Sequence, residues 1–220
     1  ARKNYRAAIS HDAFNADAQL GLGTLFFASG HHSKALTHLN RALAQRKTDT
    51  AIAVMIARAQ LALGRPAAAR KAIKRLSKKM AKSAEVRFLL GRADEETGKL
   101  KRAAKHYRAA IKSKPDIFAP YLHLSRVLIK QKKKKDAFAL LGEAKKAIPN
   151  SAEVHNAFGE AFLRHRKYDD AIASFSEALR LDSGLNSAAF NLGSTLRRQG
   201  NTRRAIDRLE QLEQRDREYP

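Results

Sequence analysis

Small residues recur at a fixed interval of 34 residues along the whole chain. One set with this spacing is Gly23, Ala57, Gly91, Ser125, Gly159 and Gly193. A second set is Ala1, Ala35, Ala69, Ala103, Ala137, Ala171 and Ala205. No insertion breaks the register of either set. A single period that runs through a chain is typical of arrays in which each repeat packs only against its neighbours.

Each period contains two apolar patterns with helical spacing, separated by a short polar turn. The clearest pair is VHNAFGEAFLRH at 154–165 and DAIASFSEALRL at 170–181. A single helical hairpin cannot bury both of its faces, so the repeats must stack. A small residue where two helices cross lets their backbones approach closely. The sequence therefore predicts an all-α array of stacked helical hairpins.

The repeat at 152–185 carries the most complete motif, which consists of Gly159, Phe162, Ala171, Phe175 and Ala178. In these residues, and over essentially its whole length, the chain resembles the tetratricopeptide repeat (TPR) family. The family's closing proline is present as Pro115 and Pro149, whereas its early tryptophan is replaced, for example by Arg87, Tyr121 and His155. The resemblance implies a right-handed superhelical solenoid of antiparallel hairpins, whose first helices line a concave groove.

The register divides the chain into one continuous solenoid domain. We expect a second helix of a truncated repeat at 1–15, followed by six full repeats at 16–49, 50–83, 84–117, 118–151, 152–185 and 186–219. Because the register begins halfway through a repeat, we predict that the sequence is a piece of a longer protein. The unfinished ends of the stack would expose apolar helix faces, so self-association through them is a further expectation.

Composition narrows the class of protein. Hydrophobic residues make up 44% of the chain, which is enough to bury a substantial core. The longest apolar stretches, such as LGLGTLFFA at 20–28, are too short to span a bilayer, so we expect no membrane insertion. Cysteine is absent, which fits either a reducing cytosol or a periplasm. We favour a cytoplasmic location, and the periplasm remains an alternative.

The formal net charge of +23 favours an anionic partner. Basic residues exceed acidic ones by 9, 4 and 6 in the repeats at 50–83, 84–117 and 118–151. The most concentrated basic run is four lysines at 132–135, which falls on the turn between the two helices of a repeat. We interpret this run as a solvated turn, and a binding patch is the alternative.

A more specific signal lies on the first helices, which the resemblance assigns to the groove. We predict a partner-binding groove formed by Arg58, Arg92, Arg126, Lys130, Arg164, Arg198, Val54, Phe88, Leu122 and Phe190. Its cations recur at the ninth and thirteenth positions of a repeat, and its apolar residues at the fifth. Glu95 and Glu96 follow Arg92 at helical spacing and could pair with it, whereas Arg58 and Arg126 have no acid at those offsets.

The predicted function is a non-catalytic scaffold or adaptor that binds an acidic protein or peptide segment in this groove. The alternative is binding of nucleic acid or another polyanion through the basic surface of the repeats at 50–151. The carboxylate clamp of co-chaperones in this family is not recognisable. The eight histidines are scattered and no catalytic motif occurs, so we expect no catalytic residue, metal or cofactor.

Overall fold

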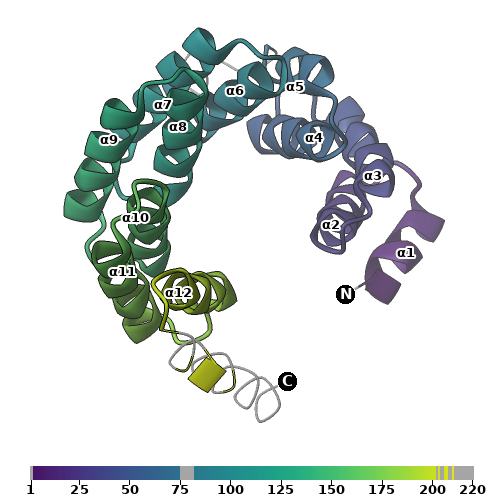
Figure 1. Ribbon diagram of the computed structural model, residues 1–220. Helices are drawn as coiled ribbons and strands as arrows, with labels where there is room; N and C mark the ends of the chain where they lie inside the picture. Colours follow the sequence, from purple (N-terminus) through teal and green to yellow (C-terminus); the bar gives the residue numbers. More distant parts are fainter. Residues whose placement is uncertain (1, 75–81, 202, 204–205, 208–209, 211–220) are drawn as a thin grey trace. The chain divides into compact units, whose positions relative to one another are not determined.

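The computed structural model describes residues 2–74, 82–201, 203, 206–207 and 210, and every regular element among them is a helix (Figure 1). The expectation of an all-α fold built from helical hairpins is confirmed. The chain divides into two compact units, Ala1–Lys114 and Pro115–Pro220. The second helix predicted for the repeat at 186–219 falls mainly outside the described residues.

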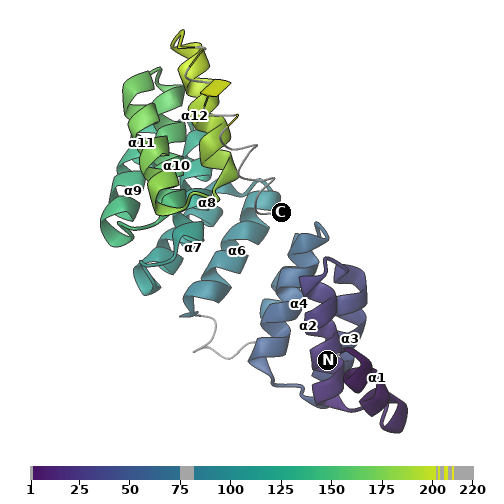
Figure 2. The ribbon, with the colours of Figure 1, turned by 90° about the horizontal axis from the view of Figure 1, so that it is seen from below.

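The first unit begins with a single helix and continues with three hairpins. Its helices are α1 (Arg2–His11), α2 (Ala16–Ala28), α3 (His32–Gln45), α4 (Thr50–Ala62), α5 (Pro66–Ile73), α6 (Ala84–Glu96) and α7 (Leu100–Ser113). The second unit contains α8 (Phe118–Lys130), α9 (Lys134–Ala147), α10 (Ala152–Arg164), α11 (Tyr168–Leu181) and α12 (Asn186–Arg198). In the second unit α10 contacts both α8 and α12, the first helices of the neighbouring repeats (Figures 1 and 2).

Side-chain caps fix the start of several first helices. The carboxylate of Asp49 accepts hydrogen bonds from the backbone N–H groups of the first turn of α4, and Asn15 caps α2 in the same way. The hydroxyls of Ser83 and Ser151 accept hydrogen bonds from the first turns of α6 and α10. Each cap satisfies a backbone donor that has no partner within the helix, so the residue before the apolar pattern sets the helix boundary.

The recurring small residues have a packing reason. Phe175 on α11 is fully buried, and its ring lies directly on the backbone of α10 at Gly159. Tyr107 on α7 is buried in the same way against Gly91 on α6, where an added Cβ would come within 2.5 Å of the ring. A side chain at either glycine would therefore separate the two helices of the hairpin.

The turn between the two helices of every repeat contains one left-handed residue. In four repeats this residue is a glycine, and in the other two it is Lys132 with a φ of 63° or Arg166 with a φ of 58°. The glycines are Gly30, Gly64, Gly98 and Gly200. Glycine is the usual choice because a Cβ disfavours this conformation. The second unit therefore contains two turns whose sequence does not suit their backbone.

Candidate functional site

In the first unit, the arginines predicted for the groove are paired with acidic side chains. Arg58 on α4 forms an ion pair with Glu85, which belongs to the first helix of the next repeat. Nη2 of Arg92 lies 3.1 Å from Oε1 of Glu96, one turn further along α6. The pairing considered for Arg92 is therefore present, and Arg58 has a partner that its own helix does not supply.

The apolar residues predicted for the groove of the first unit are only partly accessible. Val54 is 6% exposed and packs in the core beside Val86 and Leu89, so this part of the prediction is wrong. Phe88 is half-buried, and its ring centroid lies 5.8 Å from that of Tyr107. The Tyr107 hydroxyl donates a hydrogen bond to Glu95, and burial together with this bond raises the pKa of Tyr107.

The second unit contains a cavity of about 280 Å³ between α8, α9 and α10. We call it the α8–α10 cavity. Its lining residues are Leu122, Ser125, Arg126 and Ile129 from α8, Lys134, Ala137, Phe138 and Leu141 from α9, and Ala157, Glu160, Ala161, Arg164 and His165 from α10 and its C-cap. The cavity brings together three of the predicted groove residues, Leu122, Arg126 and Arg164.

The charge at this cavity is predominantly positive. Arg126 is exposed and makes no ion pair with any residue that the structure describes. Nη2 of Arg164 lies 3.9 Å from Oε2 of Glu160, and the two side chains are 57% and 40% exposed. A long, solvent-exposed pair of this kind contributes only about 0–1 kcal/mol. Both guanidinium groups therefore remain available to an external carboxylate.

The floor of the α8–α10 cavity is apolar. Small side chains at Ala157 and Ala161 leave space on α10, and Leu122 and Ile129 cover the facing side of α8. Phe138 on α9 also lines the cavity, and its ring packs edge-to-face against the rings of Phe158 and Phe162 on α10. An apolar floor with a few charged groups at its margin is the usual composition of a ligand-binding cleft.

The remaining predicted residues do not line this cavity. Lys130 is exposed at the C-terminal end of α8, and Arg198 is exposed at the end of α12. Phe190 on α12 is 66% exposed, which is unusual for so large an apolar side chain.

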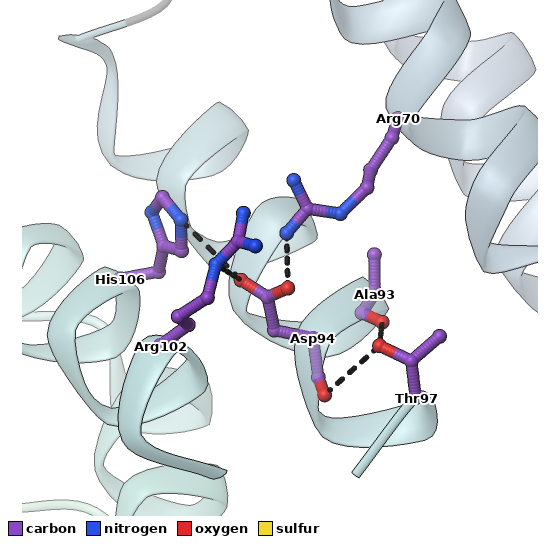
Figure 3. Close-up of polar contacts among 6 residues, drawn as sticks. All are labelled: Arg70, Ala93, Asp94, Thr97, Arg102 and His106. Atoms are coloured by element: carbon purple, nitrogen blue, oxygen red, sulfur yellow. Dashed lines mark hydrogen bonds and ion pairs between the residues drawn. The ribbon is translucent and has the colours of Figure 1, made fainter. Parts of the chain in front are cut away.

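A buried charge network in the first unit was not predicted from the sequence (Figure 3). Asp94 on α6 is completely buried and forms an ion pair with Arg70 on α5. Its Oδ2 lies 3.7 Å from Nε of Arg102 and 3.5 Å from Nε2 of His106, both on α7. Because these partners come from α5 and α7, Asp94 joins two consecutive repeats. We call these four residues the Asp94 network.

The Asp94 network also changes the titration of His106. Burial lowers the pKa of His106, and the positive charges of Arg70, Arg102 and Lys105 lower it further, while Asp94 acts in the opposite direction. The composition of the network indicates a structural role, since a single carboxylate faces two guanidinium groups. Among the described residues, no three His, Asp or Glu side chains are grouped so that they could hold a metal ion.

No helix in the described part of the chain is long and apolar enough to cross a membrane.

A tetratricopeptide repeat family model matches residues 26–93 and 95–158, and a second one matches 1–50 and 156–220. None of the curated proteins compared with this chain matches it.

Similar solved structures share the fold at low sequence identity. A thermophilic TPR protein of Thermus thermophilus is 24% identical, with a TM-score of 0.66 over 82% of this chain and 98% of that one. PilF of Pseudomonas aeruginosa is 17% identical, with a TM-score of 0.71 over 93% and 92% of the two chains. MamA of Desulfovibrio magneticus, from residue 41 to its end, is 21% identical, with a TM-score of 0.60 over 77% and 96%. The family models cover most of the sequence, and the chain belongs to the tetratricopeptide repeat family.

Proposed function

We propose that this chain is a non-catalytic scaffold whose α8–α10 cavity binds an acidic segment of a partner protein. The TPR fold is generally a protein-interaction scaffold and is generally non-catalytic. The observation that carries the proposal is the pair Arg126 and Arg164, whose charges are not neutralised by a close internal pair, above an apolar floor. A carboxylate gains charge-assisted hydrogen bonds from guanidinium groups, which are stronger than neutral ones.

The spacing of the two arginines suggests the form of the ligand. They lie on first helices of consecutive repeats, and packed helices are roughly 8–10 Å apart. An extended peptide advances about 3.3 Å per residue. Carboxylates about three residues apart would therefore reach both arginines, while an apolar side chain between them would face Leu122, Ile129 and Ala161.

The paired arginines of the first unit remain candidates for the same partner. The side chains of the Arg58–Glu85 pair are 50% and 45% exposed, and those of the Arg92–Glu96 pair are 36% and 29% exposed. Exposed pairs of this kind contribute only about 0–1 kcal/mol, so a ligand carboxylate could displace the internal acid at little cost. We expect Arg58 and Arg92 to contribute less affinity than Arg126 and Arg164.

Fluorescence anisotropy with a labelled peptide of Asp and Glu residues interrupted by leucine tests this proposal. The double variant Arg126→Glu with Arg164→Glu is expected to weaken binding by about 100-fold or more, because two charge-assisted hydrogen bonds are replaced by repulsion. The matched control is Lys146→Glu with Arg197→Glu, two exposed cations on α9 and α12 that do not line the cavity.

The control should weaken binding only slightly, and less as salt increases, because it changes the overall charge alone. Equal losses in the two double variants, with helical content unchanged by circular dichroism, would contradict a site at the cavity.

A further inference from the structure

A second cavity lies at the edge of the second unit, beside the turns that join α8 to α9 and α10 to α11. Its volume is about 310 Å³, and we call it the turn-edge pocket. It is lined by Lys134, Lys135, Phe138, Ala139, Phe162, His165 and Lys167. Its volume is at the lower end of the range for ligand pockets, roughly 300–1,000 Å³, which suits one large side chain rather than a bulky ligand.

The polar part of this lining is entirely basic. Three of the residues are lysines, one is histidine, and no acidic side chain lines the pocket. Lys134, Lys135 and Lys167 are exposed and form no ion pair with the residues that the structure describes. Three ammonium groups without counterions around one cavity favour the binding of an anionic ligand.

The interior of the turn-edge pocket is aromatic. The ring centroids of Phe138 and Phe162 lie 5.2 Å apart in an edge-to-face arrangement. Phe158 packs against both rings, at 5.4 Å from Phe138 and 5.7 Å from Phe162. Because the rings pack against each other, they offer an apolar wall to an inserted side chain rather than a free flat face on which a nucleobase could stack.

The pocket adjoins the α8–α10 cavity, since both are lined by Lys134, Phe138 and His165. A peptide lying in the α8–α10 cavity would therefore leave it past the ring of Phe138. Leu122, Ile129 and Ala161 line that cavity and give the apolar side chains of such a peptide a surface to pack on, whereas a phosphate backbone has no apolar group to place there. The adjoining surface thus favours a peptide over a nucleic acid.

The turns beside the pocket carry further positive charge in an unfavourable backbone conformation. Lys132 and Arg166 have positive φ at the position where the other four repeats have glycine. Lys132 lies two residues before Lys134, and Arg166 stands between His165 and Lys167. The two repeats that form the pocket are therefore the two in which a cation replaces the residue best suited to the turn. Retention of a strained residue is common at functional sites.

We propose that the turn-edge pocket binds one large apolar side chain of the acidic partner segment, with flanking carboxylates placed against Lys134, Lys135 and Lys167. This inference rests on the proposed function, because the segment is the one that occupies the α8–α10 cavity. It defines the partner motif further, as a phenylalanine or leucine with acidic residues on both sides. The basic run at 132–135 is then part of a binding site and not only a solvated turn.

Two labelled peptides test the apolar part of the inference. One contains Asp and Glu residues around a single phenylalanine, and the other has alanine in place of the phenylalanine. Wild-type protein should bind the phenylalanine peptide about tenfold more tightly, because burial of an aromatic side chain is favourable. Equal affinity for the two peptides would overturn the proposal.

A cavity-filling substitution tests whether the preference for the phenylalanine peptide arises in the turn-edge pocket. Ala139 is exposed and lines the pocket, so Ala139→Phe should fill it without changing charge or a core position. The variant should bind both peptides with the affinity that the wild type shows for the alanine peptide. Ala173→Phe, at an exposed position on α11, is the matched control and should keep the tenfold preference. A preference retained in Ala139→Phe would overturn the proposal.

Charge reversal separates this inference from the proposed function. Lys134→Glu, Lys135→Glu and Lys167→Glu together should weaken the binding of both peptides more than Lys112→Glu, Lys146→Glu and Arg197→Glu together, three exposed cations that do not line the pocket. If Arg126→Glu with Arg164→Glu abolishes binding and the turn-edge variants do not alter it, the inference fails and the proposed function stands. The reverse result contradicts the proposed function, and with it the claim that the pocket and the α8–α10 cavity hold one segment. Tighter binding of oligothymidylate than of peptide, lost in Ala139→Phe, would overturn the proposal and identify nucleic acid as the occupant.

Discussion

Replacing the left-handed Lys132 and Arg166 by glycine should stabilise the second unit. Both residues have the backbone conformation that four other repeats of this chain assign to glycine, at φ of 63° and 58°. For a residue with a Cβ this conformation costs roughly 1–2 kcal/mol. Glycine removes that cost but loses more conformational entropy on folding, by roughly 0.5–1 kcal/mol. The net gain expected in the free energy of unfolding is about 0.5–1 kcal/mol for Lys132→Gly and about the same for Arg166→Gly.

Thermal unfolding followed by circular dichroism measures this gain. For a chain of this size, about 1 kcal/mol shifts Tm by about 2–4 °C, so the double variant should unfold about 2–8 °C above wild type. Lys132→Ala removes the charge and keeps the Cβ, and it separates strain from repulsion between neighbouring lysines. This variant should gain little. Gly98→Ala, at a φ of 72°, should lose about 0.5–1 kcal/mol, which is the same balance with the opposite sign.

The reasoning is refuted if Lys132→Ala stabilises as much as Lys132→Gly, because the gain would then come from charge. It is also refuted if neither glycine variant raises Tm while Gly98→Ala is neutral. If the gain is found, the same glycine variants should bind the acidic phenylalanine peptide severalfold more weakly, since each removes one cation beside the turn-edge pocket.

Three further predictions concern packing and buried charge. Gly159→Ala should lower the free energy of unfolding by about 1–3 kcal/mol, because the added Cβ would contact Phe175. Gly142→Ala, in open space on α9, should raise it by about 0.5–1 kcal/mol. Urea unfolding of the two variants measures both changes. Asp94→Asn should cost about 2–3 kcal/mol in the same assay, because a partly buried guanidinium loses its counterion, and a neutral result would show that the network contributes little. The pKa of His106 is lowered in the folded state, so the unfolded state binds the proton more readily. The contribution of His106 to the free energy of unfolding should therefore be fully present above about pH 6.5 and decrease as the pH falls below that value. His106→Gln should flatten this part of the plot of unfolding free energy against pH.

The period and the residue types at fixed positions were enough to predict the hairpins. Gly159 and Phe175 are one small and one large residue at a repeated separation, and the structure packs one on the other. The helix starts carry a further local signal, which was not used in the prediction: Asp49 and Ser151 are capping residues directly before an apolar pattern. These features are local or recur in each repeat, so the structure of one repeat predicts the structure of the others.

The charge pairing could not be predicted because it depends on contacts between repeats. Glu85 reaches Arg58 from the following first helix, and Arg70 reaches Asp94 across a similar boundary. Helical spacing considers only residues three or four positions apart on one helix, so it finds Glu96 for Arg92 and misses the other two pairs.

The positions of the cavities also could not be predicted from the sequence pattern. The pattern placed Val54 on the groove floor by its position in the repeat, yet this side chain is buried in the core. The α8–α10 cavity exists because Ala157 and Ala161 are small where neighbouring side chains are large. Such a space depends on side chains from three helices, and no single helical pattern contains that information.

The most direct test of the central claim is a ¹H–¹⁵N correlation spectrum of the protein titrated with the acidic leucine peptide. The amides of Leu122, Arg126, Ala161 and Arg164 should shift together and saturate, because the peptide lies over the α8–α10 cavity. The exposed cations that do not line the cavity, such as Lys146 on α9 and Arg197 on α12, should be little affected. Shifts confined to those two cations, or spread over all basic residues and removed by moderate salt, would contradict the claim.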